Sequence, residues 1–230
     1  MVTDDDDAGQ PAIATATIVI SGVNVVGNTL YVVGTDLGDR VTINQTGNGK
    51  IKVTAGFLQG GPRNFSPAEN INSISVISCG GDDHVNISSG VSVPTFVDGG
   101  DGNDHLNGGN AGSVLLGGAG DDMLIGGKKG DILIGGSGRD RLIGNAGEDV
   151  LIGGSSSDYE SDPANQQLAN DEALLALLAD WNSSASRPAR ELALADLVQS
   201  IEDDEDKDTL TGSSGNDWFF TGLDDIITGN

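Results

Sequence analysis

The sequence is poor in several residue types on which globular domains and enzymes depend. Among its 230 residues there is one cysteine and there are two histidines, and aromatic residues make up 4%. A lone Cys79 excludes an intrachain disulfide, and there is no GxSxG or HExxH pattern to mark a hydrolase or a zinc protease. No apolar run approaches the roughly 18 residues needed to cross a bilayer.

Basic residues are also scarce. Eleven Lys and Arg stand against 35 Asp and Glu, which gives a formal net charge of −24. This balance argues against nucleic acid and anionic membrane surfaces as partners. So much charge with so few aromatics would normally indicate disorder, unless bound cations supply the missing stabilisation.

Glycine, by contrast, is abundant and follows a strict period of nine. Residues 99–152 read GGDGNDHLN, GGNAGSVLL, GGAGDDMLI, GGKKGDILI, GGSGRDRLI and GNAGEDVLI, and GGSSSD follows. A short fixed period is typical of a solenoid, in which one coil cannot bury a core but stacked coils can. Within each nonamer, the glycine-rich half predicts a tight turn that ends on a carboxylate. The other half predicts a very short strand with its central leucine inside the solenoid.

These nonamers resemble the GGxGxDxUx repeat of the RTX (repeats-in-toxin, haemolysin-type) family. The resemblance implies an all-β, right-handed parallel β-roll or β-helix that is loaded with several Ca²⁺ ions. It also implies two nonamers per coil, so that turns 18 residues apart stack on one edge. RTX proteins are typically bacterial and exported through an uncleaved C-terminal signal.

Stacked turns would offer calcium the six to eight oxygen ligands it prefers, whereas nothing in the repeats suits zinc. One edge aligns Asp104, Asp122, Asp140 and Asp158, and the other aligns Ser113, Asp131 and Asp149. The resemblance further implies carbonyl ligands at Gly100, Gly102, Gly118, Gly120, Gly136 and Gly138 on the first edge, and at Gly127 and Gly147 on the second. Asp83, Asp217 and Asp225, in looser copies of the repeat, complete the predicted metal ligands. The alternative is that the aspartates only cap glycine turns.

Some repeats depart from the pattern. Ser113 replaces an aspartate, so we expect the site between it and Asp131 to be weak or empty. Lys129 replaces the glycine at the fourth position of its nonamer and should strain its turn. Asn145 also replaces a glycine, which is a milder change because asparagine tolerates left-handed conformations.

The rest of the chain divides by composition. We expect a disordered acidic lead over residues 1–11, wider β-helix coils with a hairpin-like cap over 12–98, the β-roll over 99–159, a helical insertion with an acidic loop over 160–208, and renewed β-roll over 209–230. A separate small β-sandwich is the alternative for the N-terminal part. The loop EDDEDKD at 202–208 reads as solvated, with calcium binding as the alternative. The resumed roll should stack Asp217 on Asp149, and Asp225 on Asp158.

The insertion has a predicted position. Its first helix should present Leu168, Leu174, Leu175, Leu178 and Trp181 on one face, and its second Leu192, Leu194, Leu197, Val198 and Ile201. The outward strand positions of alternate nonamers are all apolar: Val114, Leu116, Ile132, Ile134, Val150, Ile152, Trp218 and Phe220. Such a stripe exceeds what a soluble monomer usually exposes. We expect the helices to cover it; a dimer or partner surface is the alternative.

The sequence therefore indicates a calcium-binding, non-enzymatic RTX module that folds on binding calcium, with a structural, adhesion or secretion-tail role. Alternatives are a calcium-stabilised polysaccharide-active enzyme or a sugar- or ice-binding module. Secretion is expected without a cleavable N-terminal signal, because MVTDDDDAGQ has no basic segment followed by an apolar one. The chain would then be exported by another route or be part of something larger. A surface, matrix or parent-protein partner is expected, and the oligomeric state stays open.

Overall fold

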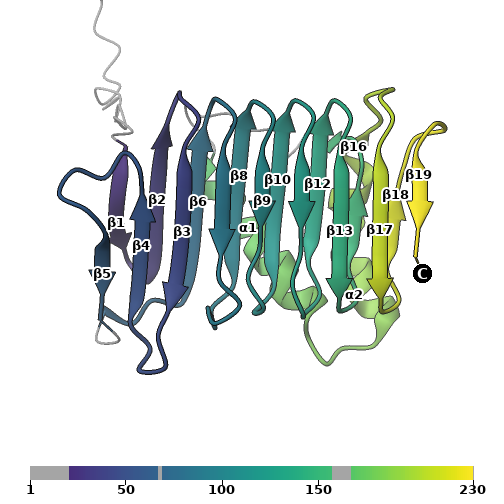
Figure 1. Ribbon diagram of the computed structural model, residues 1–230. Helices are drawn as coiled ribbons and strands as arrows, with labels where there is room; N and C mark the ends of the chain where they lie inside the picture. Colours follow the sequence, from purple (N-terminus) through teal and green to yellow (C-terminus); the bar gives the residue numbers. More distant parts are fainter. Residues whose placement is uncertain (1–20, 67–68, 157–166, 230) are drawn as a thin grey trace, which may run out of the picture.

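A computed structural model of the chain shows two β-sheets of stacked strands that face each other, with helices on one side (Figure 1). The structure describes residues 21–66, 69–156 and 167–229. The acidic lead expected over residues 1–11 and the predicted ligand Asp158 lie outside these ranges. Among the helices in the described ranges, none is long and apolar enough to cross a membrane.

Sheet A has eight strands and sheet B has nine. In spatial order, sheet A contains β1 (Gly22–Val26), β2 (Thr29–Thr35), β6 (Ser73–Cys79), β8 (Thr95–Asp101), β10 (Ser113–Ala119), β12 (Ile132–Ser137), β14 (Val150–Ile152) and β18 (Trp218–Phe220). Sheet B contains β19 (Ile226–Thr228), β17 (Thr209–Ser214), β13 (Arg141–Ala146), β11 (Met123–Ile125), β9 (His105–Asn107), β7 (His84–Ile87), β3 (Arg40–Gln45), β4 (Ile51–Ala55) and β5 (Arg63–Phe65).

The nonamer repeat sets the register of the strands. β10 pairs in parallel with β12, Leu115 opposite Leu133, and β11 pairs in parallel with β13, Leu124 opposite Leu142. These partners are 18 residues apart, so two nonamers make one coil, one in each sheet. We call the turns that lead from sheet A to sheet B the first edge, and those that lead from sheet B to sheet A the second edge.

The interior between the sheets is a ladder of the central repeat leucines. Leu106, Leu115, Leu124, Leu133 and Leu142 are each 0% exposed. Because side chains alternate along a strand, a three-residue strand can place only this one residue inside. Each buried leucine contributes about 1.5–3 kcal/mol relative to an exposed one. The same core continues into the N-terminal coils and makes no separate sandwich.

The N-terminal coils end in an antiparallel cap. β1 and β2 form a hairpin, and β3, β4 and β5 form an antiparallel meander. Parallel pairing begins where β6 joins β2 and β7 joins β3. An antiparallel cap protects the open end of a solenoid from pairing with other chains. The expected fold class, a strand-dominated solenoid of mainly parallel strands with inserted helices, is therefore confirmed.

The helical insertion leaves the solenoid at the first edge. Two short strands, β15 (Ser155–Ser156) and β16 (Ile201–Glu202), pair antiparallel at its base. Between them lie α1 (Gln167–Trp181), α2 (Arg187–Ala193) and α3 (Ala195–Gln199). All three pack on the outer face of sheet A and leave the outer face of sheet B free of helices (Figure 1).

The apolar stripe predicted from the repeats is the surface that these helices cover. Leu174, Leu178 and Trp181 of α1, together with Leu194 and Leu197, form one buried cluster with Val114, Leu116, Ile132, Ile134, Val150 and Ile152. Trp218 and Phe220 are half-buried against the same cluster. One helical expectation is wrong: Leu192 is 75% exposed, because the second predicted helix divides into α2 and α3 near Leu194. The side chain of Leu168 is not described.

Candidate calcium sites

A row of aspartates runs along the first edge, one at the end of each turn and directly before a strand of sheet B. It consists of Asp39, Asp83, Asp104, Asp122, Asp140, Asp208 and Asp225. A shorter row runs along the second edge, where Ser113 begins strand β10 and Asp131, Asp149 and Asp217 each directly precede a strand of sheet A. All but the terminal members, Asp39, Asp217 and Asp225, are buried.

Each of these carboxylates ties its own coil to the coil before it. The Oδ1 of Asp122 accepts the backbone N–H of Asp104 at 2.7 Å, and the Oδ1 of Asp140 accepts that of Asp122 at 2.8 Å. The same bond links Asp104 to Asp83 at 2.7 Å although 21 residues separate them, because the N-terminal coil is longer. Only one of the two carboxylate oxygens takes part in this ladder.

The second oxygen is the notable feature. The Oδ2 atoms of Asp83, Asp104, Asp122, Asp140, Asp149, Asp208 and Asp217 are buried and have no hydrogen-bond partner. A buried polar atom without a partner costs free energy, and a buried carboxylate without a counter-charge costs more. Ionised carboxylates along the first edge would therefore lack a compensating charge unless a cation were bound.

This burial shifts the acidity of the row. Desolvation is the largest cause and raises the pKa of Asp104 to about 6, that of Asp122 to about 8 and that of Asp140 to about 9. Neighbouring aspartates raise these pKa values further, while the ladder N–H groups lower them. The pKa values of Asp83, Asp149 and Asp208 rise to about 7 for the same main reason. At neutral pH these positions need a proton or a cation.

Glycine leaves space for a cation beside the free oxygens. A Cβ added at Gly117 would meet the carbonyl oxygen of Gly135 and the Oδ2 of Asp122. A Cβ at Gly99 would likewise meet the carbonyl oxygen of Gly117, 2.5 Å away, and the Oδ2 of Asp104. Carboxylate and carbonyl oxygens from successive coils thus converge on one small space. Oxygen-only donors with loose geometry suit Ca²⁺.

The donor set is not a cluster of side chains. In the described ranges, no group of three or more His, Cys, Asp or Glu side chains comes together to hold a metal. Each candidate site instead combines aspartates of stacked turns with backbone carbonyls, as the repeat pattern predicts. These residues fit calcium and offer nothing for a tetrahedral zinc site.

Gly117→Ala tests whether this space is needed. The substitution is expected to destabilise the calcium-loaded protein by about 1–3 kcal/mol or more, since the methyl group must displace a backbone carbonyl and a carboxylate. Denaturant unfolding in saturating calcium measures the effect. Gly56→Ala is the matched control, because a Cβ there meets nothing within 4 Å. Equal effects of the two substitutions would contradict the assignment of this space.

The predicted carbonyl donors divide into two groups by backbone conformation. Those of the first edge all have positive φ, from 93° to 133°: Gly100, Gly102, Gly118, Gly120, Gly136 and Gly138. Gly147 on the second edge follows them with φ 129°. Gly127 and Lys129 are not in the left-handed region, so this turn takes another path and avoids the strain expected at Lys129. Asn145 does adopt φ 71° in place of glycine.

Asp131 differs from the other buried aspartates of the two rows. Its Oδ1 accepts the N–H of Ser113 at 2.6 Å, and its Oδ2 accepts the N–H of Gly127 at 2.5 Å. Neither oxygen is therefore free of a backbone partner, and the weak or empty site expected between Ser113 and Asp131 stays a prediction.

The stacking expected for the resumed repeat is half right. Asp217 stacks on Asp149, whose N–H donates to the Oδ1 of Asp217 at 2.9 Å. Asp225, however, stacks on Asp208, whose N–H donates to the Oδ1 of Asp225 at 2.9 Å; its expected partner Asp158 lies outside the described residues. Asp208 also stacks on Asp140, a position that the nonamer pattern assigned to Asp158. Its Oδ1 accepts the N–H of Asp140 at 2.7 Å.

Two residues of the first-edge row were missing from the predicted ligand set. Asp208 could have been predicted from the sequence, since residues 208–211 (DTLT) have the same spacing of aspartate and inward leucine as the repeat. Its loop is part of the turn and not merely solvated: the Oδ2 of Asp204 accepts the N–H of Gly138 at 2.7 Å. Asp39 extends the row by one coil, since its N–H donates to the Oδ1 of Asp83 at 2.5 Å.

These features define a class of protein: a two-sheet β-roll whose turns carry oxygen-rich cation sites. The model of one family, described as the RTX calcium-binding nonapeptide repeat (4 copies), matches residues 98–128, 125–160 and 200–225. The chain thus carries RTX calcium-binding nonapeptide repeats, and these imply Ca²⁺ binding. The third matched segment contains Asp208. No curated protein and no solved structure gives a significant match to the chain.

Proposed function

We propose that this chain is a calcium-dependent folding module of a secreted bacterial protein. The row of buried, unpartnered Oδ2 atoms along the first edge supports the proposal, because these atoms need a cation when the coils stack at neutral pH. Asp83, Asp104, Asp122, Asp140 and Asp208 would hold the ions together with carbonyls of the glycine turns. Bound calcium would supply the positive charge that this row lacks. Ion binding and coil stacking would then share one free energy.

The role of the module is structural and not catalytic in this proposal. Each buried aspartate of the turns already serves the stacking of coils, which accounts for its burial without a reaction. None of the helices that the structure describes lies on the outer face of sheet B, which would be the side offered to a surface, matrix or parent-protein partner. Secretion fits the chemistry, because extracellular calcium is abundant enough to fill weak oxygen-ligand sites.

A calcium titration of the full chain, followed by far-UV circular dichroism from an EDTA-treated start, tests the folding switch. We expect a steep, cooperative gain of β signal with calcium. Magnesium at the same concentrations is the control, because it demands near-ideal octahedral geometry and gives up its water reluctantly. A spectrum in EDTA equal to that in calcium would overturn the proposal, and an equal response to magnesium would remove its specificity.

A further inference from the structure

On the second edge, one pair of stacked turns, at Ser113 and Asp131, lacks a carboxylate ligand for calcium and is held by other contacts. Ser113 supplies no carboxylate, and both oxygens of Asp131 accept backbone N–H groups. The hydroxyl of Ser113 takes part in a bond with Thr95 at 3.0 Å. Unlike the first edge, this pair of turns therefore offers no unpartnered side-chain oxygen to an ion.

The end of α1 lies against this turn. The Oδ1 of Asn182 accepts the N–H of Gly130 at 3.0 Å, and its Nδ2 donates to the carbonyl oxygen of Gly130 at 2.7 Å. One side chain thus satisfies both backbone groups of the residue before Asp131. The Nδ2 also donates to the carbonyl oxygen of Leu178 at 3.1 Å, which fixes the side chain to its own helix.

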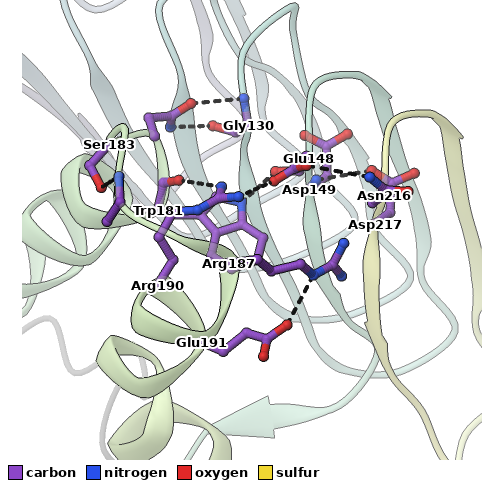
Figure 2. A network of polar contacts seen from close by, with 12 residues as sticks. Gly130, Glu148, Asp149, Trp181, Ser183, Arg187, Arg190, Glu191, Asn216 and Asp217 are labelled. Atoms are coloured by element: carbon purple, nitrogen blue, oxygen red, sulfur yellow. Dashed lines mark hydrogen bonds and ion pairs between the residues drawn. The ribbon is translucent and has the colours of Figure 1, made fainter.

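Neighbouring contacts extend the fastening to the next turn of the same edge (Figure 2). Trp181, 1% exposed, donates its indole N–H to the carbonyl oxygen of Glu148. Arg190 forms an ion pair with the Glu148 carboxylate at 2.5 Å and donates to the carbonyl oxygen of Trp181 at 2.9 Å. Its guanidinium lies 5.0 Å from the centre of a Trp181 ring. Glu148 directly precedes Asp149, so the helices also hold the turn that carries this aspartate.

We infer that the helical insertion replaces a calcium ion on the second edge of the roll. Asn182 holds the turn that ends at Asp131, where this turn stacks on Ser113. The roll is then held in two ways: by ions along the first edge and by helix contacts along part of the second. The loss of the carboxylate at Ser113 is tolerated because Asn182 holds this turn. The comparison of the two edges rests on the proposed function, whereas the helix contacts do not.

Asn182→Ala in the calcium-saturated full chain tests the inference. The ring centres of the two tryptophans, Trp181 and Trp218, lie 5.7 Å apart beside this edge, so tryptophan fluorescence reports the docking of the helices. We expect the urea midpoint of the fluorescence change to fall by about 0.5 M, from the loss of the paired bonds to Gly130. The number of calcium ions bound, measured by isothermal titration calorimetry, should equal that of the unchanged chain. Ser183→Ala is the matched control, since the hydroxyl of this neighbour caps only the N–H of Ala185.

Asn182→Asp distinguishes a turn that is held by the amide of Asn182 from a turn that is held by a bound calcium ion. The variant keeps an acceptor for the N–H of Gly130 but loses the donor to its carbonyl oxygen. If the amide replaces the ion, Asn182→Asp weakens docking as Asn182→Ala does. The inference would be overturned if Asn182→Asp bound an additional calcium ion or bound calcium more tightly than the unchanged chain. It would also be overturned if the urea midpoint of the fluorescence change were unchanged in Asn182→Ala. A chain that binds no calcium would instead overturn the proposed function and leave the fluorescence comparison intact.

Discussion

Asp140→Asn is expected to raise the calcium concentration for half-maximal folding by at least about 100-fold. Removing a residue that only orients a metal ligand through a hydrogen bond typically lowers metal affinity about 10–100-fold. Asp140 would contact the ion directly, so its effect should be at least as large. The same substitution should stabilise the calcium-free chain at pH 8. Burial raises the pKa of Asp140 to about 9, so the calcium-free fold must protonate this group or bury its charge, and asparagine needs neither. The two effects have opposite signs.

The position of Asp140 explains why its removal should matter most. Its Oδ1 accepts the N–H of Asp122, and its own N–H donates to Asp208 across the base of the insertion. Its Oδ2 has no partner and lies where a Cβ of Gly135 would sit, beside the carbonyl oxygen of Gly153. Asparagine preserves the shape and the Oδ1 acceptor but removes the charge. A change in calcium affinity therefore reports the loss of the carboxylate.

Asp121→Asn is the matched control for this experiment. Asp121 is a neighbouring carboxylate of the same edge, but it is exposed and pairs with Arg139 at 2.6 Å. A surface pair of this kind contributes little to stability. Circular dichroism at increasing calcium, in parallel with EDTA-treated samples, measures both effects. Equal shifts in the two variants would mean that net charge, and not the buried oxygen, governs the response.

The repeats made most of the architecture predictable. A strict period of nine predicts one inward leucine per strand, and the resemblance to the RTX family implies two nonamers per coil, which gives the 18-residue register of both sheets. The helix-covered face was predictable because Val114, Ile132 and Val150 are outward positions that a soluble solenoid cannot leave bare. Leu192 was misassigned because helical spacing alone does not show that α2 ends and α3 begins beside Leu194.

The exact ligand set was less predictable, for two physical reasons. At the insertion, counting in nines continues to Asp158, whereas the chain leaves the roll at β15 and returns through β16 with Asp208 in register. At Asp131, the sequence supplies the expected carboxylate, but the turn has no left-handed residue at 127 or 129. It brings the N–H of Gly127 onto the Oδ2. Which oxygens stay free depends on backbone path, and the repeat pattern does not contain that information.

In the absence of calcium, acidification is expected to stabilise the fold. The pKa values of Asp83, Asp104, Asp122, Asp140, Asp149 and Asp208 lie at about 6 to 9 in the folded chain, against 3.8 for an unperturbed aspartate. Between these limits the folded chain binds more protons than the unfolded chain, so the free energy of unfolding falls as pH rises. The stabilisation is complete below about pH 4 and is lost progressively as the pH rises from there through the folded pKa values of about 6 to 9. EDTA-treated protein should therefore gain β signal when the pH is lowered from 9 to 5.

Calcium should reverse the dependence on pH, because protons and ions compete for the same carboxylates. Lowering the pH from 8 to 6 is expected to raise the calcium concentration at half-maximal folding, while the same change stabilises the ion-free chain. Far-UV circular dichroism over a grid of pH and calcium concentration measures both trends. Asp140→Asn supplies the internal control, since it removes the aspartate with the highest of these six pKa values and should flatten the pH dependence of the ion-free fold above pH 8. An ion-free fold that weakens steadily from pH 9 to 5 would show that these aspartates are not buried as charges in need of a cation.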